Sequence, residues 1–181
     1  MIKLFGRLKQ RGPLLFIGST LFAVSAMVGI PTPASAWSEW GNLVSQDSGL
    51  CLTAAAATDF SVWQASCSNW QGNAYWRMKP IGNGYYSIVN PWGKCLDVYA
   101  FNHDNPGRVT TWDCNGYTNQ QWAVTTSIYG LNLKPRHAIN DNGGRGKCLD
   151  VIGFSHTSGD PVGQWDCWGG QNQLWRFTGW Q

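Results

Sequence analysis

The sequence predicts an all-β protein built from three pseudo-symmetric repeats. Helix-favouring residues are scarce, because Glu39 is the only glutamate among 181 residues, whereas Gly, Asn, Thr, Ser and Trp are frequent. A set of motifs recurs along the chain, and the six cysteines are spaced so that two fall in each copy. Recurrence of this kind is typical of a repeat architecture.

The first 36 residues have the pattern of a leader that is removed on export. A basic stretch from Lys3 to Arg11 precedes 17 mostly apolar residues, Leu14–Ile30, and Ala34-Ser35-Ala36 gives an A-x-A cleavage pattern. This order is typical of a secretory signal peptide. An uncleaved membrane anchor is the alternative, although 17 residues is short for a membrane span. We therefore expect a secreted, extracellular domain of residues 37–181, with no stable membrane insertion after cleavage.

The predicted mature part has almost no net charge. Four of the 13 basic residues lie in the leader, which leaves nine basic against ten acidic residues and a net charge of −1. Nucleic-acid-binding domains usually carry a basic face, so we expect no nucleic-acid partner. The remaining length suits one domain and argues against a two-domain enzyme.

The second and third repeats are the most similar copies. The 20 residues from Cys95 to Cys114 align without a gap onto Cys148–Cys167, and ten of them are identical. An Asn-Gln-x-Trp motif follows in both copies and ends at Trp122 and Trp175. The first repeat is weaker but keeps both cysteines and ends its last motif at Trp76. The repeats span about residues 41–81, 82–128 and 129–181.

Each repeat has apolar residues at strand-like spacing, separated by Gly, Asn and Pro turns. One such unit is too small to bury a core, so three must associate as an open array or as a closed threefold barrel. A closed barrel leaves no exposed strand edges. We expect the equivalent residues Trp76, Trp122 and Trp175 to meet in the core near the pseudo-threefold axis.

These motifs together resemble the ricin B-chain type lectin family, also known as carbohydrate-binding module family 13. The resemblance rests on Cys-Leu-Asp-Val, Trp-Asp-Cys and two Gln-x-Trp motifs, and it covers about residues 41–179. It implies a β-trefoil of twelve strands, six in a barrel and six capping it, with one disulfide in each repeat. The implied pairs are Cys51–Cys67, Cys95–Cys114 and Cys148–Cys167, and the matching positions of the cysteines agree with such local pairing.

The same resemblance implies a sugar-binding site in each strong repeat. The family's ligand residues are the Asp of the first motif, the aromatic residue two before the second cysteine, and the Asn-Gln before x-Trp. A carboxylate accepts hydrogen bonds from sugar hydroxyls, an amide donates and accepts, and an aromatic ring stacks on the apolar face of the sugar. The implied sets are Asp97, Trp112, Asn119 and Gln120 in the second repeat, and Asp150, Trp165, Asn172 and Gln173 in the third.

Each of these positions also has a purely structural interpretation. The Asp residues would cap turns, the Trp residues would belong to the core, and the Gln residues would support the fold. In the sugar-binding interpretation, Gln120 and Gln173 orient the Asp and touch the sugar at its edge. The first repeat has Thr53, Ala65 and Ala74 in place of Asp, Trp and Gln, so we expect it to be structural. Trp168 is a candidate extension of the third site. The Gly-rich insertion Asn140–Gly146 lengthens the third repeat, and no function is assigned to it.

The predicted function is a secreted carbohydrate-binding lectin whose partners are glycans or polysaccharides of the galactose or xylan type. An enzyme is not expected, because glycosidases use two carboxylates about 5–9 Å apart. Asp97 and Asp150 lie in different repeats, and Asp113 should point away from Trp112 on a strand. We expect no cofactor, and no metal site, because the three His residues are scattered. The alternative is a protein-interaction trefoil, such as the targeting subunit of a toxin or an inhibitor.

Overall fold

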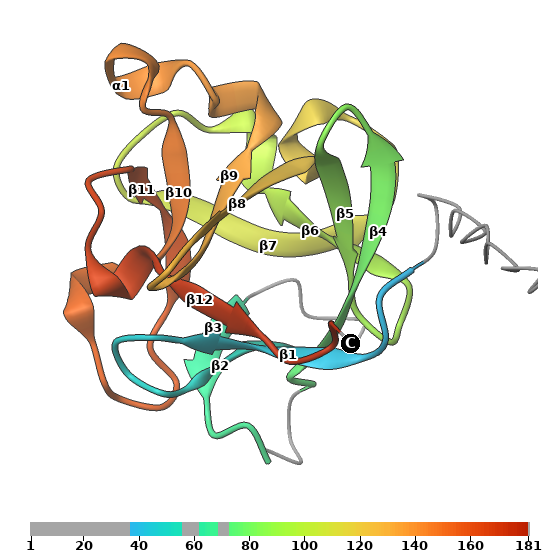
Figure 1. The fold of residues 1–181 in the computed structure, drawn as a ribbon, viewed down its shortest axis with the longest axis vertical. Helices are drawn as coiled ribbons and strands as arrows, with labels where there is room; N and C mark the ends of the chain where they lie inside the picture. The colour runs from blue at the N-terminus through green and yellow to red at the C-terminus, as the bar shows by residue number, and fades with distance from the viewer. Residues whose placement is uncertain (1–36, 56–61, 69–72, 181) are drawn as a thin grey trace, which may run out of the picture. The chain divides into compact units, whose positions relative to one another are not determined.

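A computed structural model describes residues 37–55, 62–68 and 73–180, and the leader predicted for residues 1–36 lies outside the described residues. Four strands fall in each repeat (Figure 1). The first repeat holds β1 (Gly41–Ser45), β2 (Cys51–Ala54), β3 (Val62–Ala65) and β4 (Tyr75–Gly82). The second holds β5 (Tyr85–Val89), β6 (Lys94–Val98), β7 (Gly107–Asp113) and β8 (Trp122–Ser127). The third holds β9 (Gly130–Pro135), β10 (Lys147–Val151), β11 (Val162–Asp166) and β12 (Trp175–Phe177).

Six strands close into an antiparallel barrel. The ring of pairs runs β1–β4, β4–β5, β5–β8, β8–β9, β9–β12 and back from β12 to β1. The other six strands form the hairpins β2–β3, β6–β7 and β10–β11, one from each repeat. This arrangement confirms the expected all-β fold, a β-trefoil of three repeats, and selects the closed barrel over the open array.

Three tryptophans occupy the centre of the core, as the repeat pattern predicted. Trp76, Trp122 and Trp175 are completely buried in one hydrophobic cluster. Each indole N–H donates a hydrogen bond to a main-chain carbonyl of its own repeat, at 2.9, 2.9 and 3.1 Å respectively. The rings therefore bury large apolar surfaces without leaving a polar group unpaired, which would cost about 1–3 kcal/mol each.

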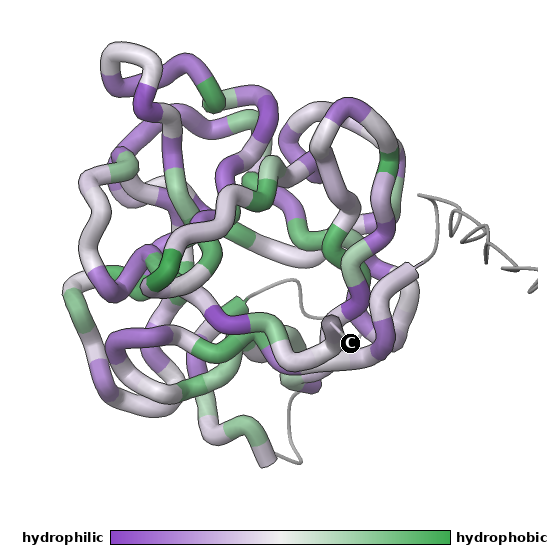
Figure 2. The backbone as a smooth tube through the Cα atoms, viewed as in Figure 1, coloured by the Kyte–Doolittle hydropathy of each residue, from purple (hydrophilic) through white to green (hydrophobic). Residues whose placement is uncertain are grey.

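The cap hairpins add further apolar residues to this cluster, including Val98 from β6 and Val151 from β10. Hydrophobic and hydrophilic residues alternate along many of the strands (Figure 2). In β9, for example, the buried Leu131 and Leu133 alternate with partly exposed polar residues. In such strands this period of two directs one face to the core and the other toward solvent.

Each repeat is closed by its own disulfide, as expected. The pairs Cys51–Cys67, Cys95–Cys114 and Cys148–Cys167 enclose sequence separations of 16, 19 and 19 residues. In the loop-entropy account, closing loops of this size contributes about 3 kcal/mol each. The disulfides therefore tie the end of each cap hairpin to its start.

Short helical turns connect the strands and carry several residues of the candidate sites. They are η1 (Tyr99–Phe101), η2 (Thr118–Gln120), η3 (Arg136–Ala138), α1 (Asp141–Gly144), η4 (Ile152–Phe154) and η5 (Gln171–Gln173). In the described part of the chain, no helix has the length and apolar character needed to span a membrane.

Candidate functional site

The polar residues predicted for the second repeat come together at the end of β6. Asp97 points its Oδ2 atom at two amide donors of η2, Asn119 Nδ2 and Gln120 Nε2, both at 2.9 Å. Asn119 also donates to the main-chain oxygen of Val98 at 3.0 Å. The three side chains are buried, and Asp97 is only 5% exposed. The result is a fixed carboxylate held by neighbouring amides.

The third repeat builds the same arrangement. Asn172 Nδ2 donates to Asp150 Oδ1 at 3.0 Å, and Gln173 Nε2 donates to Asp150 Oδ2 at 2.8 Å. Asn172 also donates to the main-chain oxygen of Val151 at 3.2 Å. Asp150 is 2% exposed. The two repeats thus place the same residue types at matching positions on a strand and a short helical turn.

Burial makes both carboxylates harder to ionise than usual. Desolvation raises the pKa of Asp97, and the hydrogen bonds from Gln120 and Asn119 offset part of that rise. The same balance raises the pKa of Asp150 to about 6. With a pKa of about 6, Asp150 is mostly an anion at pH 7, and amide donors rather than water solvate its carboxylate.

One buried acceptor in each arrangement has no partner. Asn119 Oδ1 and Asn172 Oδ1 are inaccessible to solvent and receive no hydrogen bond from any described residue. A buried carbonyl without a donor costs about 1–3 kcal/mol. Both repeats bear this cost at the equivalent atom, so the two arrangements match even in their unpaired group.

Trp112 and Trp165 lie outside the core, being 42% and 36% exposed. In the second repeat a cavity of about 370 Å³ is bordered by Trp112 together with Asp97 and Asn119. A ring at the rim and a carboxylate at the floor match the apolar face and the hydroxyls of a sugar. The remaining lining residues are Tyr99, Ala100, Phe101, Asn115 and Tyr117.

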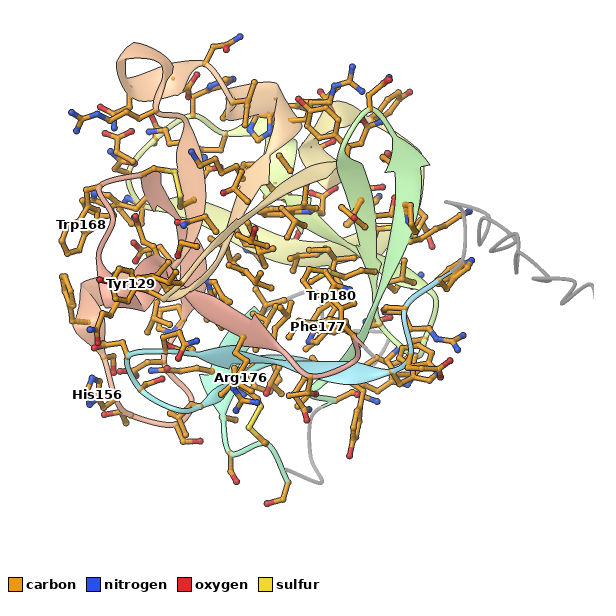
Figure 3. All side chains as sticks on the ribbon, in the orientation of Figure 1. Tyr129, His156, Trp168, Arg176, Phe177 and Trp180 are labelled. Carbon is orange, nitrogen blue, oxygen red and sulfur yellow. A yellow bond between two sulfur atoms is a disulfide. The ribbon has the colours of Figure 1, made fainter. Side chains whose placement is uncertain are left out.

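A second aromatic wall was missed by the sequence analysis in the second repeat. Tyr117 and Phe101 lie with their ring centroids 6.1 Å apart. In the third repeat the equivalent Phe154 is met instead by Trp168, at 5.3 Å. Trp168 was predicted to extend the third site, and its indole is 51% exposed beside Phe154 (Figure 3).

Gly170 explains why Tyr117 supplies the second ring in the second repeat, whereas Trp168 supplies it in the third. It is the third-repeat counterpart of Tyr117, and a Cβ there would lie 2.0 Å from Trp168 Cζ2. The missing side chain lets the Trp168 ring lie across the backbone. In the second repeat Asn115 stands at the Trp168 position, so the tyrosine has room.

The first repeat lacks this chemistry. Thr53 turns its hydroxyl to the main-chain oxygen of Cys51 at 3.1 Å, and Asn73 Oδ1 accepts from the main-chain N–H of Tyr75 at 2.7 Å. Ala65 and Ala74 are buried. These residues complete local turns and strands, and they present no carboxylate.

The other charged residues near the sites form ion pairs or join repeats. Asp113 lies 2.6 Å from Lys94 Nζ, and its side chain is largely exposed. His103 contacts Asp141 at 2.7 Å in the next repeat, and His156 contacts Asp47 at 3.0 Å in the first. Within the described ranges no group of three or more His, Cys, Asp or Glu side chains is placed to hold a metal ion.

Comparison with known families gives the fold and its repeats an assignment. The ricin-type β-trefoil lectin domain matches residues 39–134, more than half of the chain, and a ricin-type β-trefoil lectin domain-like family matches residues 136–180. The chain belongs to the ricin-type β-trefoil lectin family. No curated protein matches it by sequence.

Solved structures with a similar fold agree with the assignment. The designed 3-fold symmetric protein ThreeFoil is 34% identical, with a TM-score of 0.69, and the match covers 76% of this chain and 96% of ThreeFoil. An exo-β-1,3-galactanase from Clostridium thermocellum is 28% identical, with a TM-score of 0.67, over 82% of this chain. The hemolytic lectin CEL-III is 28% identical, with a TM-score of 0.59, over 79% of this chain. The chain spans only 30% of the galactanase and 30% of CEL-III.

Proposed function

We propose that this ricin-type lectin is a secreted carbohydrate-binding protein with two sugar sites, one in the second and one in the third repeat. The lectin fold and the lectins among its structural neighbours support carbohydrate binding. The observation that carries the two-site proposal is the duplicated arrangement of a buried Asp held by Asn and Gln amides, with a partly exposed Trp two residues before the second cysteine.

Each proposed site recognises a sugar by two kinds of contact. Asp97 or Asp150 accepts hydrogen bonds from sugar hydroxyls, and the amide of Asn119 or Asn172 holds that carboxylate in place. Trp112 or Trp165 stacks on the apolar face of the ring. Gln120 and Gln173, predicted as ligand residues, serve in this proposal to position the carboxylates. The first repeat contributes stability only.

The arrangement favours binding over hydrolysis. The usual glycosidase mechanism needs a carboxyl pair about 5–9 Å apart around one glycosidic bond. Among the described residues, Asp97 is the one carboxylate that borders the second-repeat cavity. The neighbouring Asp113 forms an ion pair with Lys94 and does not line that cavity.

Galactose-type glycans and xylan-type polysaccharides are the proposed partners. The exo-β-1,3-galactanase neighbour is named for a galactan, which supports testing galactosides first. Two sites on one rigid domain raise the avidity for a polysaccharide, because the second contact becomes intramolecular.

Binding of residues 37–181 to galactosides and xylo-oligosaccharides, measured by calorimetry, tests the proposal. Asp97→Ala and Asp150→Ala should each remove one site, and the double variant should remove both. Losing charge-assisted hydrogen bonds worth about 1.5–3 kcal/mol predicts about a 10- to 100-fold weaker affinity at the altered site. Asp113→Ala is the matched control, because it removes an exposed carboxylate of the second repeat outside the cavity.

The double variant must be shown to fold, by its circular dichroism and melting temperature. A folded double variant that binds sugars as well as the unaltered protein would overturn the two-site proposal. Loss of binding in Asp113→Ala equal to that in Asp97→Ala would also contradict it, since a general charge effect would then explain both results.

A further inference from the structure

The Gly-rich insertion Asn140–Gly146 is fixed against the end of β11. Gly146 accepts a hydrogen bond through its main-chain oxygen from the N–H of Cys167 at 2.9 Å, and Asn142 Nδ2 donates to the main-chain oxygen of Cys167 at 3.3 Å. Lys134 of β9 donates through Nζ to the main-chain oxygen of Arg145 at 3.0 Å. The insertion therefore has a defined place directly beside Trp168.

A cavity of about 310 Å³ lies between the insertion, β9 and the segment after β11. Its charged lining residues are both cations, Lys134 and Arg145. Trp168 supplies an aromatic surface, and Asn132, Cys167 and Gly169 complete the lining. Within the described residues, neither cation forms a salt bridge with a carboxylate. Two like charges brought together without a counter-charge repel each other and attract an anion.

The second repeat has no such pair of cations. Val89 is the counterpart of Lys134. Val89 pairs with the residue after Trp76 in the neighbouring strand, and Lys134 pairs with the residue after Trp122. Trp92 is the counterpart of Arg145, since each precedes the first cysteine of its repeat by three residues. The second repeat therefore lacks the cation pair of the third.

We propose that this cavity binds the anionic group of an acidic sugar, either the carboxylate of a uronic acid or a sulfate ester. The Arg145 guanidinium pairs with two oxygens of such a group at once, and Lys134 adds a second charge. Trp168 stacks on the apolar face of the same sugar ring, which a bare phosphate or sulfate ion lacks.

Trp168 also connects this cavity to the third sugar site, because its ring packs on Phe154 at 5.3 Å. The third repeat would accordingly bind a glycan that carries acidic sugars, while the second repeat binds neutral ones. This inference rests on the proposed function, since it adds a sugar class to the third repeat.

The test measures the acidic-to-neutral preference of the third repeat, in an Asp97→Ala background that removes the second site. Galactose, galacturonic acid and galactose 6-sulfate form one matched probe set, and a xylo-oligosaccharide with and without a glucuronic acid branch forms another. We expect at least one acidic member to bind about tenfold more tightly than its neutral partner. The pair of galactose derivatives separates a carboxylate from a sulfate ligand.

Arg145→Gln should abolish that preference without changing the affinity for the neutral sugar. Lys134→Gln is a second variant, and it should reduce the preference for acidic over neutral sugars. Arg176→Gln is the matched control, because Arg176 is an exposed arginine of β12 that lies apart from Trp168 (Figure 3). It removes one positive charge and should leave the preference unchanged.

Equal binding of acidic and neutral probes, or an unchanged preference in Arg145→Gln, would overturn the acidic-sugar site. An equal loss of preference in Arg176→Gln would also overturn it, since net charge would be the cause. The proposed function fails separately, when neutral-sugar binding does not depend on Asp97 or Asp150.

Discussion

Gln120 donates a hydrogen bond from Nε2 to Oδ2 of Asp97 at 2.9 Å. The same nitrogen donates to the main-chain oxygen of Asp113 at 2.9 Å, and Gln120 Oε1 accepts from the N–H of Asn115 at 2.9 Å. Both protons of the amide are thus used within the protein. Gln120 is therefore placed to orient the carboxylate, and it has no free donor for a ligand.

This relationship predicts that Gln120 acts on sugar binding through Asp97. In an Asp150→Ala background, Gln120→Leu should weaken binding about tenfold, because the carboxylate loses a donor worth about 1.5–3 kcal/mol. The pKa of Asp97 should rise further, since the lost hydrogen bond lowers it in the unaltered protein. Calorimetry measures the affinity, and an NMR titration of Asp97 measures the pKa.

Gln121→Leu is the control for this prediction. Gln121 is the adjacent glutamine, but it bonds Gly116 and Arg136 instead of Asp97. Its replacement should move neither the affinity nor the pKa. Weaker binding in Gln120→Leu with an unmoved pKa of Asp97 would contradict the positioning role.

Sugar binding by the third repeat should depend on pH. Burial raises the pKa of Asp150 to about 6, and only the ionised carboxylate accepts two hydroxyls. In an Asp97→Ala background, affinity should fall about tenfold between pH 7 and pH 5, because most of the carboxyl is then protonated. Calorimetric titrations across this range measure the effect. An affinity that stays constant from pH 7 to pH 5 would exclude Asp150 as an ionised acceptor.

The carboxyl of Asp150 should also affect the free energy of unfolding. A rise in pH strengthens sugar binding through this group but lowers the stability of the fold. Its folded pKa lies above the usual 3.8, so its contribution to stability is complete below pH 3.8 and is lost as the pH rises through about 6. His137 acts in the other direction, because burial lowers its pKa and its contribution is lost as the pH falls below 6.5. The difference in unfolding free energy between the unaltered protein and Asp150→Asn removes the His137 effect. Between pH 4 and pH 7 the unaltered protein should therefore lose unfolding free energy relative to Asp150→Asn.

Gly170→Ala should weaken the third site by displacing a ring. The new Cβ would lie 2.0 Å from Trp168 Cζ2, so the indole must leave Phe154. Backbone strain is not the cause, because Gly170 has φ −69° and its counterpart Tyr117 adopts φ −73° with a full side chain. We expect a several-fold loss of affinity, similar to that of Trp168→Ala, in an Asp97→Ala background. In the Trp168→Ala, Gly170→Ala double variant the two effects should not add, and additive effects would contradict the displacement.

The same pair of positions marks the limit of what the sequence predicts. The three repeats and their buried tryptophans were predictable, because the same residue types recur at equivalent positions. The closed barrel and the three disulfide pairs followed from the family resemblance that those motifs carry. The role of Tyr117 in the second repeat was not predicted, although Trp168 in the third was, because the two rings pack on equivalent Phe residues from different sequence positions. Comparison of the repeats detects residue types that recur at the same position, whereas the site needs only a ring at a given point in space. The cation pair was missed for a related reason, since neither Lys134 nor Arg145 recurs in the second repeat, where Val89 and Trp92 are the counterparts.

The three disulfides should contribute alike to stability but differently to binding. Replacing both cysteines of Cys51–Cys67 or of Cys148–Cys167 by Ala opens a loop of similar size. Each change should lower the unfolding free energy by about 3 kcal/mol, measured by denaturant titration. Sugar binding should weaken only in the Cys148, Cys167 variant, because Cys167 holds the insertion and precedes Trp168.

The first-repeat pair is the matched control for that comparison. Its repeat offers no carboxylate to a sugar, so its loss should reduce stability and leave the affinity of the folded fraction unchanged. Calorimetry well below the melting temperature of each variant separates the two quantities. If the folded Cys51, Cys67 variant lost sugar binding as fully as the third-repeat variant, the repeats would not act as separate supports for their own sites. The assignment of binding to the second and third repeats would then have to be replaced by a site shared with the first.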